Sequence, residues 1–389
     1  MSPGVYIAGS GKDAGKTTLC LGLSGVLNSM VPGGVSFFKP LGQKITVVDG
    51  ESVGQDSWFI SRALGLPGIQ GESTPLLASR GAAERFVTTG EPRGIHNAVK
   101  RAFREHSRNS GLVLVEGTGH PGVGSVFDLG NARVASLLGI PVILVLDGGV
   151  GSTIDSFCLC RALFRTHGVP ILGVVINRVK PDKYDSIASV LGLWFSGAGV
   201  PVFGVLPFVE RIAMPSIASV TREIGALPLF TPEGPLSSNG SGFLTAFDSS
   251  DEVLSRIGRE EGRALLVSRS RPEVLDAVIV SALSGGPRPS AVVVCGGEPD
   301  QRRQNACIAS GIPLFHTAAS LQGSADRLSG HVFKIEPDEG EKIASILEMV
   351  GRNVDSRRIL EMLRGDGRSR ERAPEKGVLG FLKRLFRRG

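Results

Sequence analysis

Short apolar runs recur through the first half of the chain, separated by longer stretches in which apolar residues follow helical spacing. Each run is continuous and bounded by glycine or proline, and the runs begin at Val5, Val35, Leu112, Val142, Ile171 and Val202. Such runs are typical of parallel strands that are buried on both faces and joined by crossover helices. The pattern predicts a three-layer α/β domain with a mostly parallel sheet over residues 1–228.

A second, smaller series of apolar runs follows a stretch rich in Gly, Ser and Pro at residues 229–244. These runs begin at Ala264, Ala291, Ile312 and His331, and a helical pattern near Lys342–Val350 comes after them. We therefore expect a second α/β domain over residues 229–352. Polar residues dominate from 364 onward, and we expect a linker over residues 353–376.

The positive charge of the chain is concentrated near residue 389. The net charge is +6, and residues 365–389 contain eight Lys/Arg but only three Asp/Glu. The folded body is therefore close to neutral, which gives no indication of nucleic-acid binding. The five cysteines do not form a zinc set, and this usage is typical of a reduced, cytoplasmic protein.

A glycine-rich stretch, GSGKDAGKTT at residues 9–18, directly follows the first apolar run. Glycines allow backbone N–H groups to surround an anion, and the helix that follows adds unpaired donors. Lys16 is placed to reach terminal phosphates, and the Thr17 hydroxyl is placed to bind Mg²⁺. Five residues separate Gly9 from Gly15, one more than in the usual P-loop, and the alternative is a simple connecting turn. The nucleotide-binding residues predicted in this loop are Gly11, Lys12, Asp13, Ala14, Gly15, Lys16, Thr17 and Thr18.

Two carboxylates are candidates for the metal site. Glu116 ends the run LVLVE, so we expect it at the carboxyl edge of the sheet, where ligands bind in such folds. Asp56 follows the second run, and its alternative role is a helix N-cap. Because Mg²⁺ needs few protein oxygens, Thr17, Asp56 and Glu116 would suffice as ligands.

The first domain resembles dethiobiotin synthetase and its relatives, which include the cobyrinic and cobyric acid synthases and the N-terminal region of long phosphate acetyltransferases. The stretches that carry the resemblance are GSGKDAGKTT, FFKPLGQ, GQDSW, LVEGTGHPG, GGVGSTID, GVVINRVKP and GVLPF. The resemblance implies that Asp13 approaches the nucleotide and that Lys39 faces the substrate and the γ-phosphate. It also implies that Asn177 reads adenine and that Pro207 packs on the base, although Asn177 has a turn-forming role as its alternative. The predicted catalytic residues are Lys16, Lys39 and Asp13.

The loop after Glu116 departs from dethiobiotin synthetase and is closer to the acetyltransferase region. His120 in this loop is a candidate substrate ligand or a loop hydrogen-bonder. Ser152 and Thr153 begin a helix and are candidates for a second anion site, which in the family receives the carboxylate of the acceptor.

The second domain resembles the small regulatory domain of long phosphate acetyltransferases that is named for its Asp-Arg-Thr-Gly-Gly signature. The signature itself is degraded to VSRSRPE, so a ligand role for Arg269 or Arg271 does not follow. The large transacetylase domain is absent from this chain, and acetyl transfer is not expected. We expect the second domain to have a regulatory or partner-binding role.

Residues 377–389, GVLGFLKRLFRRG, form an amphipathic pattern. On a helical wheel one arc contains Val378, Leu379, Phe381, Leu382, Leu385 and Phe386, and the other contains Lys383, Arg384, Arg387 and Arg388. Apolar residues opposite cations predict a helix that lies on an anionic membrane. The stretch also resembles the membrane-targeting helix of MinD-type cell-division ATPases. Docking of this helix on the protein itself or on a partner is the alternative.

Together these features predict an ATPase that binds ATP and Mg²⁺, forms a homodimer, and attaches peripherally to the inner face of the cytoplasmic membrane. An ATP-dependent ligase that activates a carboxylate or carbamate is the alternative enzyme. A nucleotide-binding scaffold with negligible turnover is the third possibility.

Overall fold

The computed structural model describes residues 2–66, 73–79, 81–89, 94–232, 242–331 and 333–365. The chain forms two compact units, one made of residues up to Val209 together with those from Ile343 onward, and a second from Glu210 to Lys342. These limits differ from the expected boundaries at 228 and 352. The reason is that residues 210–228 join the second sheet and its helices, whereas the chain returns to the first unit at Ile343.

The first unit contains a six-stranded parallel sheet, as expected from the apolar runs. Its order is β10-β9-β8-β1-β7-β2. All six strands coincide with predicted runs: β1 Gly4–Gly9, β2 Val35–Phe38, β7 Leu112–Glu116, β8 Val142–Asp147, β9 Ile171–Val179 and β10 Val202–Pro207. Parallel pairing places the carboxyl ends of all these strands at one edge, where the glycine-rich loop also lies.

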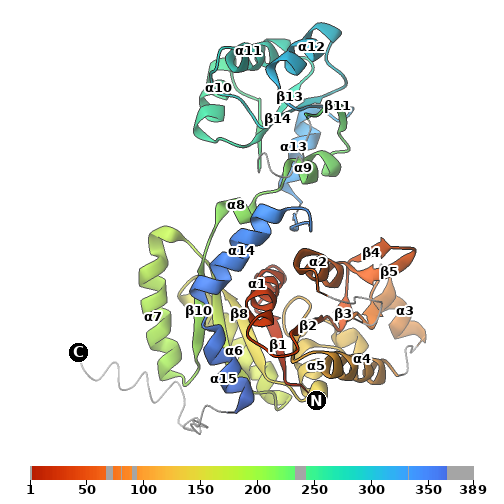
Figure 1. The fold of residues 1–389 in the computed structure, drawn as a ribbon, viewed down its shortest axis with the longest axis vertical. Coiled ribbons are helices and arrows are strands. Elements are labelled where there is room, and N and C mark those ends of the chain that lie inside the picture. The colour runs from red at the N-terminus through yellow and green to blue at the C-terminus, as the bar shows by residue number, and fades with distance from the viewer. Residues whose placement is uncertain are drawn as a thin grey trace. The chain divides into compact units, whose positions relative to one another are not determined.

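Helices cover both faces of this sheet (Figure 1). One core contains side chains from α4 Ile95–Asn109, α5 Asn131–Leu138, α6 Gly151–Thr166 and α7 Tyr184–Gly197. Tyr6 and Ala8 of β1 belong to this core, whereas the alternate residues Val5 and Ile7 do not. On the opposite face, α1 Lys16–Asn28 packs on the strands and contacts α2 Gln55–Leu64 and α15 Ser356–Arg364.

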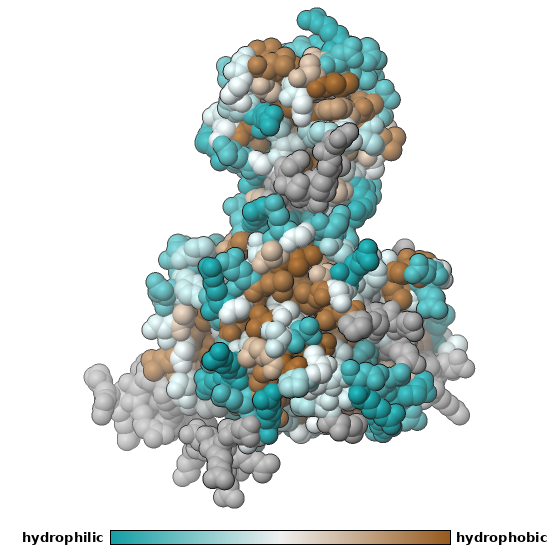
Figure 2. Space-filling model, in the orientation of Figure 1, coloured by the Kyte–Doolittle hydropathy of each residue, from teal (hydrophilic) through white to brown (hydrophobic). Residues whose placement is uncertain are grey.

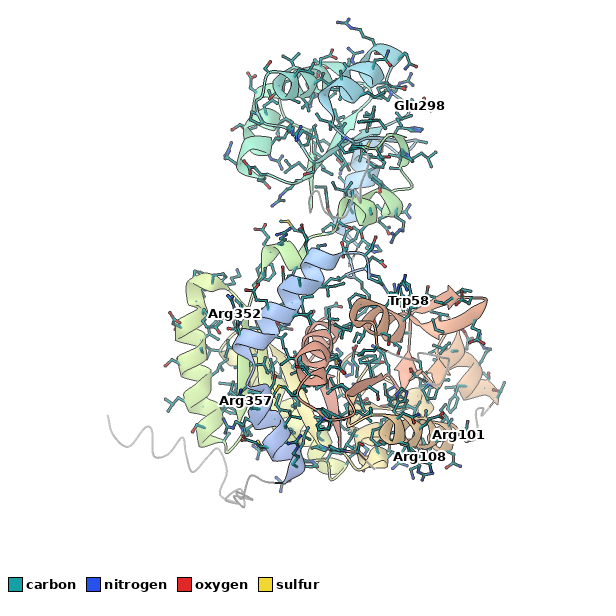
Figure 3. The ribbon with its side chains drawn as sticks, viewed as in Figure 1. Trp58, Arg101, Arg108, Glu298, Arg352 and Arg357 are labelled. Carbon is teal, nitrogen blue, oxygen red and sulfur yellow. The ribbon has the colours of Figure 1, made fainter. Side chains whose placement is uncertain are left out.

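Helix α4 shows how the polar pattern orients these elements. Its buried side chains, such as Val99 and Phe103, join the core. Arg101 and Arg108 lie along its exposed side (Figure 3). An apolar stripe opposite charged residues is the pattern of a helix with one face on the core.

Small elements lie between β2 and β7. They are β3 Leu41–Gly42, paired with β6 Leu76–Leu77, the hairpin β4 Ile45–Val48 and β5 Glu51–Gly54, and α3 Ala82–Thr89. The hairpin was not among the expected elements. Asp49 and Gly50 form its two-residue turn with φ of 51° and 83°. Asp-Gly between apolar residues is the sequence signal that indicates such a turn.

The second unit has its own sheet, in the order β11-β15-β14-β13-β12. Four strands are parallel, and they are β12 Phe243–Thr245, β13 Ala264–Ser268, β14 Ala291–Cys295 and β15 Leu314–Thr317. The edge strand β11 Leu227–Phe230 is antiparallel to β15. The expected strand from His331 is wrong, since residues 333–336 form no strand.

Helices also cover both faces of the second sheet. One core contains side chains from α10 Ser250–Arg259, α11 Pro272–Leu283 and α12 Gln301–Ser310. The other contains side chains from α9 Ile217–Glu223 and α13 Leu321–Ser329, and the short α8 Glu210–Ala213 precedes them. Two cores on one small sheet confirm a second α/β unit.

Two helices near the end of the described chain correct the expected linker. Helix α14 Gly340–Asn353 packs on α1, and α15 Ser356–Arg364 contacts α1 and β10. The linker prediction for residues 353–376 is therefore wrong at α15, because its buried Ile359 and Leu360 pack in the first unit. Apolar side chains gather over α1 and the neighbouring part of α14 (Figure 2).

Candidate functional site

The glycine-rich loop connects β1 to α1 at the carboxyl edge of the first sheet. Gly15 precedes the helix in the left-handed region, with φ of 92°. A Cβ atom at this position would lie 1.9 Å from Nδ2 of Asn177. Glycine is required here for both reasons, because an L-residue is strained at this φ and no side chain fits.

Lys16 folds back over this loop. Its Nζ donates hydrogen bonds to the carbonyl oxygens of Gly11 at 2.8 Å and Lys12 at 3.1 Å. Burial lowers the pKa of Lys16, although the carboxylate of Glu116 acts in the opposite direction. The ammonium thus lies inside the loop, where phosphate oxygens can replace the two carbonyls as acceptors.

The strand register brings Glu116 and Lys39 to the same edge. Glu116 at the end of β7 is opposite Ile7 of β1, and Phe38, which precedes Lys39, is opposite Val115. The Thr17 hydroxyl donates to Oε1 of Glu116 at 2.9 Å. Residues from three separate stretches of the sequence are therefore assembled at one point.

Lys39 links the two predicted metal carboxylates. Its Nζ lies 2.5 Å from Oδ2 of Asp56 and 2.7 Å from Oε1 of Glu116, and all three side chains are buried. Burial favours the neutral amine, but the two carboxylates outweigh it and raise the pKa of Lys39 above its ordinary value. The lysine remains charged and neutralises one carboxylate charge.

The predicted magnesium ligands do not all fit equally. Oε2 of Glu116 is buried and has no hydrogen-bond partner among the described residues. A buried carboxylate oxygen without a partner suits a metal ion or its water. Thr17 and Glu116 therefore fit Mg²⁺, whereas Asp56 directs Oδ2 at Lys39. Within the described ranges no group of three or more His, Cys, Asp and Glu side chains is placed to hold a metal.

Asn177 at the end of β9 contacts the loop directly. Its Nδ2 donates to the Ala14 carbonyl at 3.0 Å, and the side chain is buried. Pro207 ends the neighbouring strand β10 and is half-buried. The structure thus brings Asn177 to the phosphate loop.

The remaining predicted residues differ in exposure. Lys12 and Asp13 are exposed at the loop tip, and Thr18 is half-buried on α1. Asp13 is therefore apart from the buried Lys39 cluster. An exposed carboxylate in this position is accessible to a ligand from solvent.

His120 and Thr153 already have hydrogen-bond partners within their own loops. His120 is exposed, and its Nδ1 accepts from the Gly122 N–H at 3.2 Å. The Thr153 hydroxyl donates to the Asp147 carbonyl at 2.5 Å, while Ser152 is exposed. The bond from Gly122 agrees with the alternative role of His120 as a loop hydrogen-bonder. The bond from Thr153 to Asp147 stabilises the start of α6.

In the second unit the two candidate arginines differ. Arg271 pairs with Glu273 and donates to the Ala246 carbonyl. Arg269 is exposed and lies against Gly297. Arg271 thus joins the loops after β12 and β13.

Asn131 is a site residue that sequence reasoning missed. Its side chain accepts from the Thr118 N–H and donates to the carbonyls of Thr118 and His120. Tyr6 donates to the same Asn131 oxygen at 3.0 Å, and burial raises the pKa of this tyrosine. Asn131 thereby fixes the loop after Glu116, and only its position at a helix start could have indicated it.

The predicted membrane residues lie outside the described residues, since the description ends at residue 365. In the part that is described, no helix has both the length and the apolar character needed to cross a membrane.

Comparisons with known proteins agree with the predicted family group. The chain is 25% identical to phosphate acetyltransferase from Nitratidesulfovibrio vulgaris, over 92% of this chain and 51% of that protein. It is also 25% identical to cobyric acid synthase from Pelotomaculum thermopropionicum, over 57% of this chain and 46% of that protein. The chain therefore spans about half the length of these relatives.

Among solved structures, the MinC:MinD cell division complex of Aquifex aeolicus matches 54% of this chain and 84% of that chain, with a TM-score of 0.33 and 14% identity. The AAA_26 family model, described as an AAA domain, matches residues 3–216, which is more than half of the chain. The chain belongs to the AAA_26 family.

Proposed function

We propose that the first unit binds ATP with Mg²⁺ in the loop at residues 9–18 and hydrolyses it. The observation that carries this proposal is the buried carboxylate of Glu116. Its Oε2 has no hydrogen-bond partner among the described residues, and its Oε1 accepts a hydrogen bond from the Thr17 hydroxyl. A charged oxygen is costly to bury without a partner. A magnesium ion beside Thr17 supplies that partner and neutralises charge on the phosphates.

The residues of the site have distinct tasks in this proposal. Lys16 exchanges its two carbonyl partners for the terminal phosphates. Glu116 and Thr17 hold the metal, directly or through its waters. Lys39 keeps Asp56 and Glu116 together and presents one ammonium charge near the γ-phosphate position. Asp13 approaches the nucleotide from the exposed loop tip, as in the resembling family.

Adenine recognition is assigned to Asn177 and Pro207. Asn177 is anchored through Nδ2 on Ala14, so its Oδ1 is the atom left to accept from an adenine amino group. Guanine presents an acceptor at the same place and is disfavoured. Pro207 then packs on the base.

We place the protein at the inner face of the cytoplasmic membrane as a dimeric switch. The support is the sequence of residues 377–388, in which four cations near anionic lipid contribute about 1 kcal/mol each. One such helix binds weakly, but two on a dimer bind much more tightly, because the second insertion is intramolecular. Dimerisation gated by ATP would thus gate membrane attachment.

The second unit is assigned a regulatory or protein-binding role. The phosphate acetyltransferase relative matches nearly the whole chain, including this unit, which supports a shared regulatory region.

The alternative function is an ATP-dependent ligase that activates a carboxylate or carbamate. The cobyric acid synthase relatives support it, and Lys39 near the phosphate site is placed for such chemistry. The two functions differ in what stimulates ATP consumption.

The experiment measures ATP hydrolysis by the whole chain with anionic vesicles, with neutral vesicles, and with a panel of carboxylate acceptors plus ammonia. The switch predicts stimulation by anionic vesicles, co-sedimentation that requires ATP, and loss of both after truncation at Gly377 or with Phe381→Asp. Stimulation by an acceptor alone would favour the ligase. Equal sedimentation of the truncated protein would exclude the helix as the anchor.

A further inference from the structure

Near its end, strand β9 contains one residue more than the segment of strand β10 with which it pairs. Ile176 is opposite Val205 and Val179 is opposite Pro207, so three steps along β9 match two steps along β10. The extra residue is a β-bulge at Asn177 and Arg178. Bulges occur next to active sites, where they change the direction of a side chain.

Arg178 has an unusual backbone for its residue type. Its φ is 57°, in the left-handed region that favours glycine. An arginine in this conformation is strained, and strain of this kind persists only where the surrounding structure holds it. The question is what holds it.

An ion pair fixes the Arg178 side chain to the adjacent strand. Nε and Nη2 of Arg178 donate to Oδ1 of Asp147 at 2.9 and 2.5 Å. Asp147 ends β8 directly opposite Asn177, and the next residue, Gly148, donates its N–H to the Asn177 carbonyl at 2.7 Å. The backbone of Asn177 is therefore fixed on one side by β8 and on the other by the turn at Arg178.

The bulge has a direct consequence for the phosphate loop. It directs the Asn177 side chain at the loop, where Nδ2 bonds to Ala14 and lies too close to Gly15 to admit any side chain there. This contact joins residue 177 to residues 14 and 15 and determines where the loop backbone lies before Lys16 begins the helix.

We propose that Arg178 is a positioning residue, whose ion pair with Asp147 holds the bulge that seats Asn177 against the phosphate loop. Arg178 contacts no phosphate in this proposal and acts only through Asn177. The inference rests on the proposed nucleotide binding for its functional readout, but its structural effect on the loop exists without nucleotide.

The test compares Arg178→Ala, Asn177→Ala and the double variant with the parent chain. In Mg²⁺–ATP titrations, Arg178→Ala should weaken binding about threefold, because the ion pair with Asp147 is exposed and such pairs contribute little. The same change should add nothing in the Asn177→Ala background, because its effect passes through Asn177. Arg178→Gly should lose less affinity than Arg178→Ala, because glycine adopts the left-handed backbone without strain. Arg165→Ala, which removes an exposed arginine of α6, is the matched control.

Hydrogen exchange of residues 9–18 without nucleotide separates this inference from the proposed function. Faster exchange in Arg178→Ala than in the parent, with no further increase in the double variant, supports the inference even if ATP does not bind. Unchanged exchange in Arg178→Ala, or additive effects of the two substitutions, would overturn it.

Discussion

At the residue scale, Glu116 and Lys39 determine what the site can do. Both are buried, and Lys39 lies between Glu116 and Asp56. Burying a charge is costly unless it is paired, so each of these residues depends on the others. Among the described residues, Oε2 of Glu116 has no hydrogen-bond partner, and it is the oxygen that we propose faces the metal.

Replacing Lys39 by methionine should strongly destabilise the protein. Two carboxylates would face each other in a buried site, and breaking a buried pair in this way costs about 3 kcal/mol or more. Urea denaturation at neutral pH measures the loss. Because the pKa of Lys39 is raised, its contribution is complete below the ordinary lysine pKa and is lost only at strongly alkaline pH.

The control for this prediction is Lys183→Met, which removes an exposed lysine. If Lys39→Met and Lys183→Met had the same free energy of unfolding at neutral pH, the buried pair would not be formed.

At the element scale, helix α14 depends on glycines in α1. A Cβ atom at Gly22 would lie 2.3 Å from Val350, and one at Gly25 would lie 2.4 Å from Leu347. These glycines therefore let α14 approach the helix that carries the phosphate loop. The two glycines are three residues apart, which places them on one face of α1.

Gly22→Ala should destabilise the first unit by about 1–3 kcal/mol, the usual effect of overpacking. Val350→Ala should recover part of this loss in the double variant, because it removes the atoms that collide. Gly192→Ala in α7, where an added Cβ meets nothing within 4 Å, is the control and should instead stabilise slightly. Urea denaturation of the parent, the two single glycine variants and the double variant measures their free energies of unfolding. A Gly22→Ala variant as stable as the parent would show that α14 does not pack closely on α1.

All six strands of the first sheet, and β13, β14 and β15 of the second, were predictable because continuous apolar runs report burial on two faces. Strands β11 and β12 were not predicted, because they overlap the two ends of a stretch whose Gly, Ser and Pro content indicates a loop. The phosphate loop was predictable because its glycines and its Lys-Thr pair carry their own chemistry. The positions of α14 and α15 were not, since an amphipathic helix reveals its buried face but not its neighbour. Lys39 was expected near the phosphates through the family resemblance, yet its pairing with Asp56 and Glu116 depends on strand order, which local sequence does not specify.

At the scale of the whole molecule, two units with separate cores share one chain that crosses between them twice, after Val209 and after Lys342. Each unit has a sheet covered on both faces. Independent cores can unfold separately, so a single two-state transition is not expected.

Calorimetry should therefore resolve two unfolding transitions, and Mg²⁺–ATP should raise the temperature of only one. Nucleotide at a hundredfold excess over Kd stabilises the unit that binds it by about 2.7 kcal/mol. A matched scan with Mg²⁺ and AMP controls for nonspecific effects. Equal shifts of both transitions would show that nucleotide binding involves both units.

The most direct test of the account is calorimetric titration of Mg²⁺–ATP into the whole chain and into Lys16→Ala, with Lys183→Ala as the control. Lys16 is the cation enclosed by the loop, so its removal should weaken binding at least about a hundredfold, as expected when a buried charge loses its partner. The control should bind like the parent. Binding of Mg²⁺–ATP by Lys16→Ala with the affinity of the parent would contradict the assignment of residues 9–18 as the phosphate site.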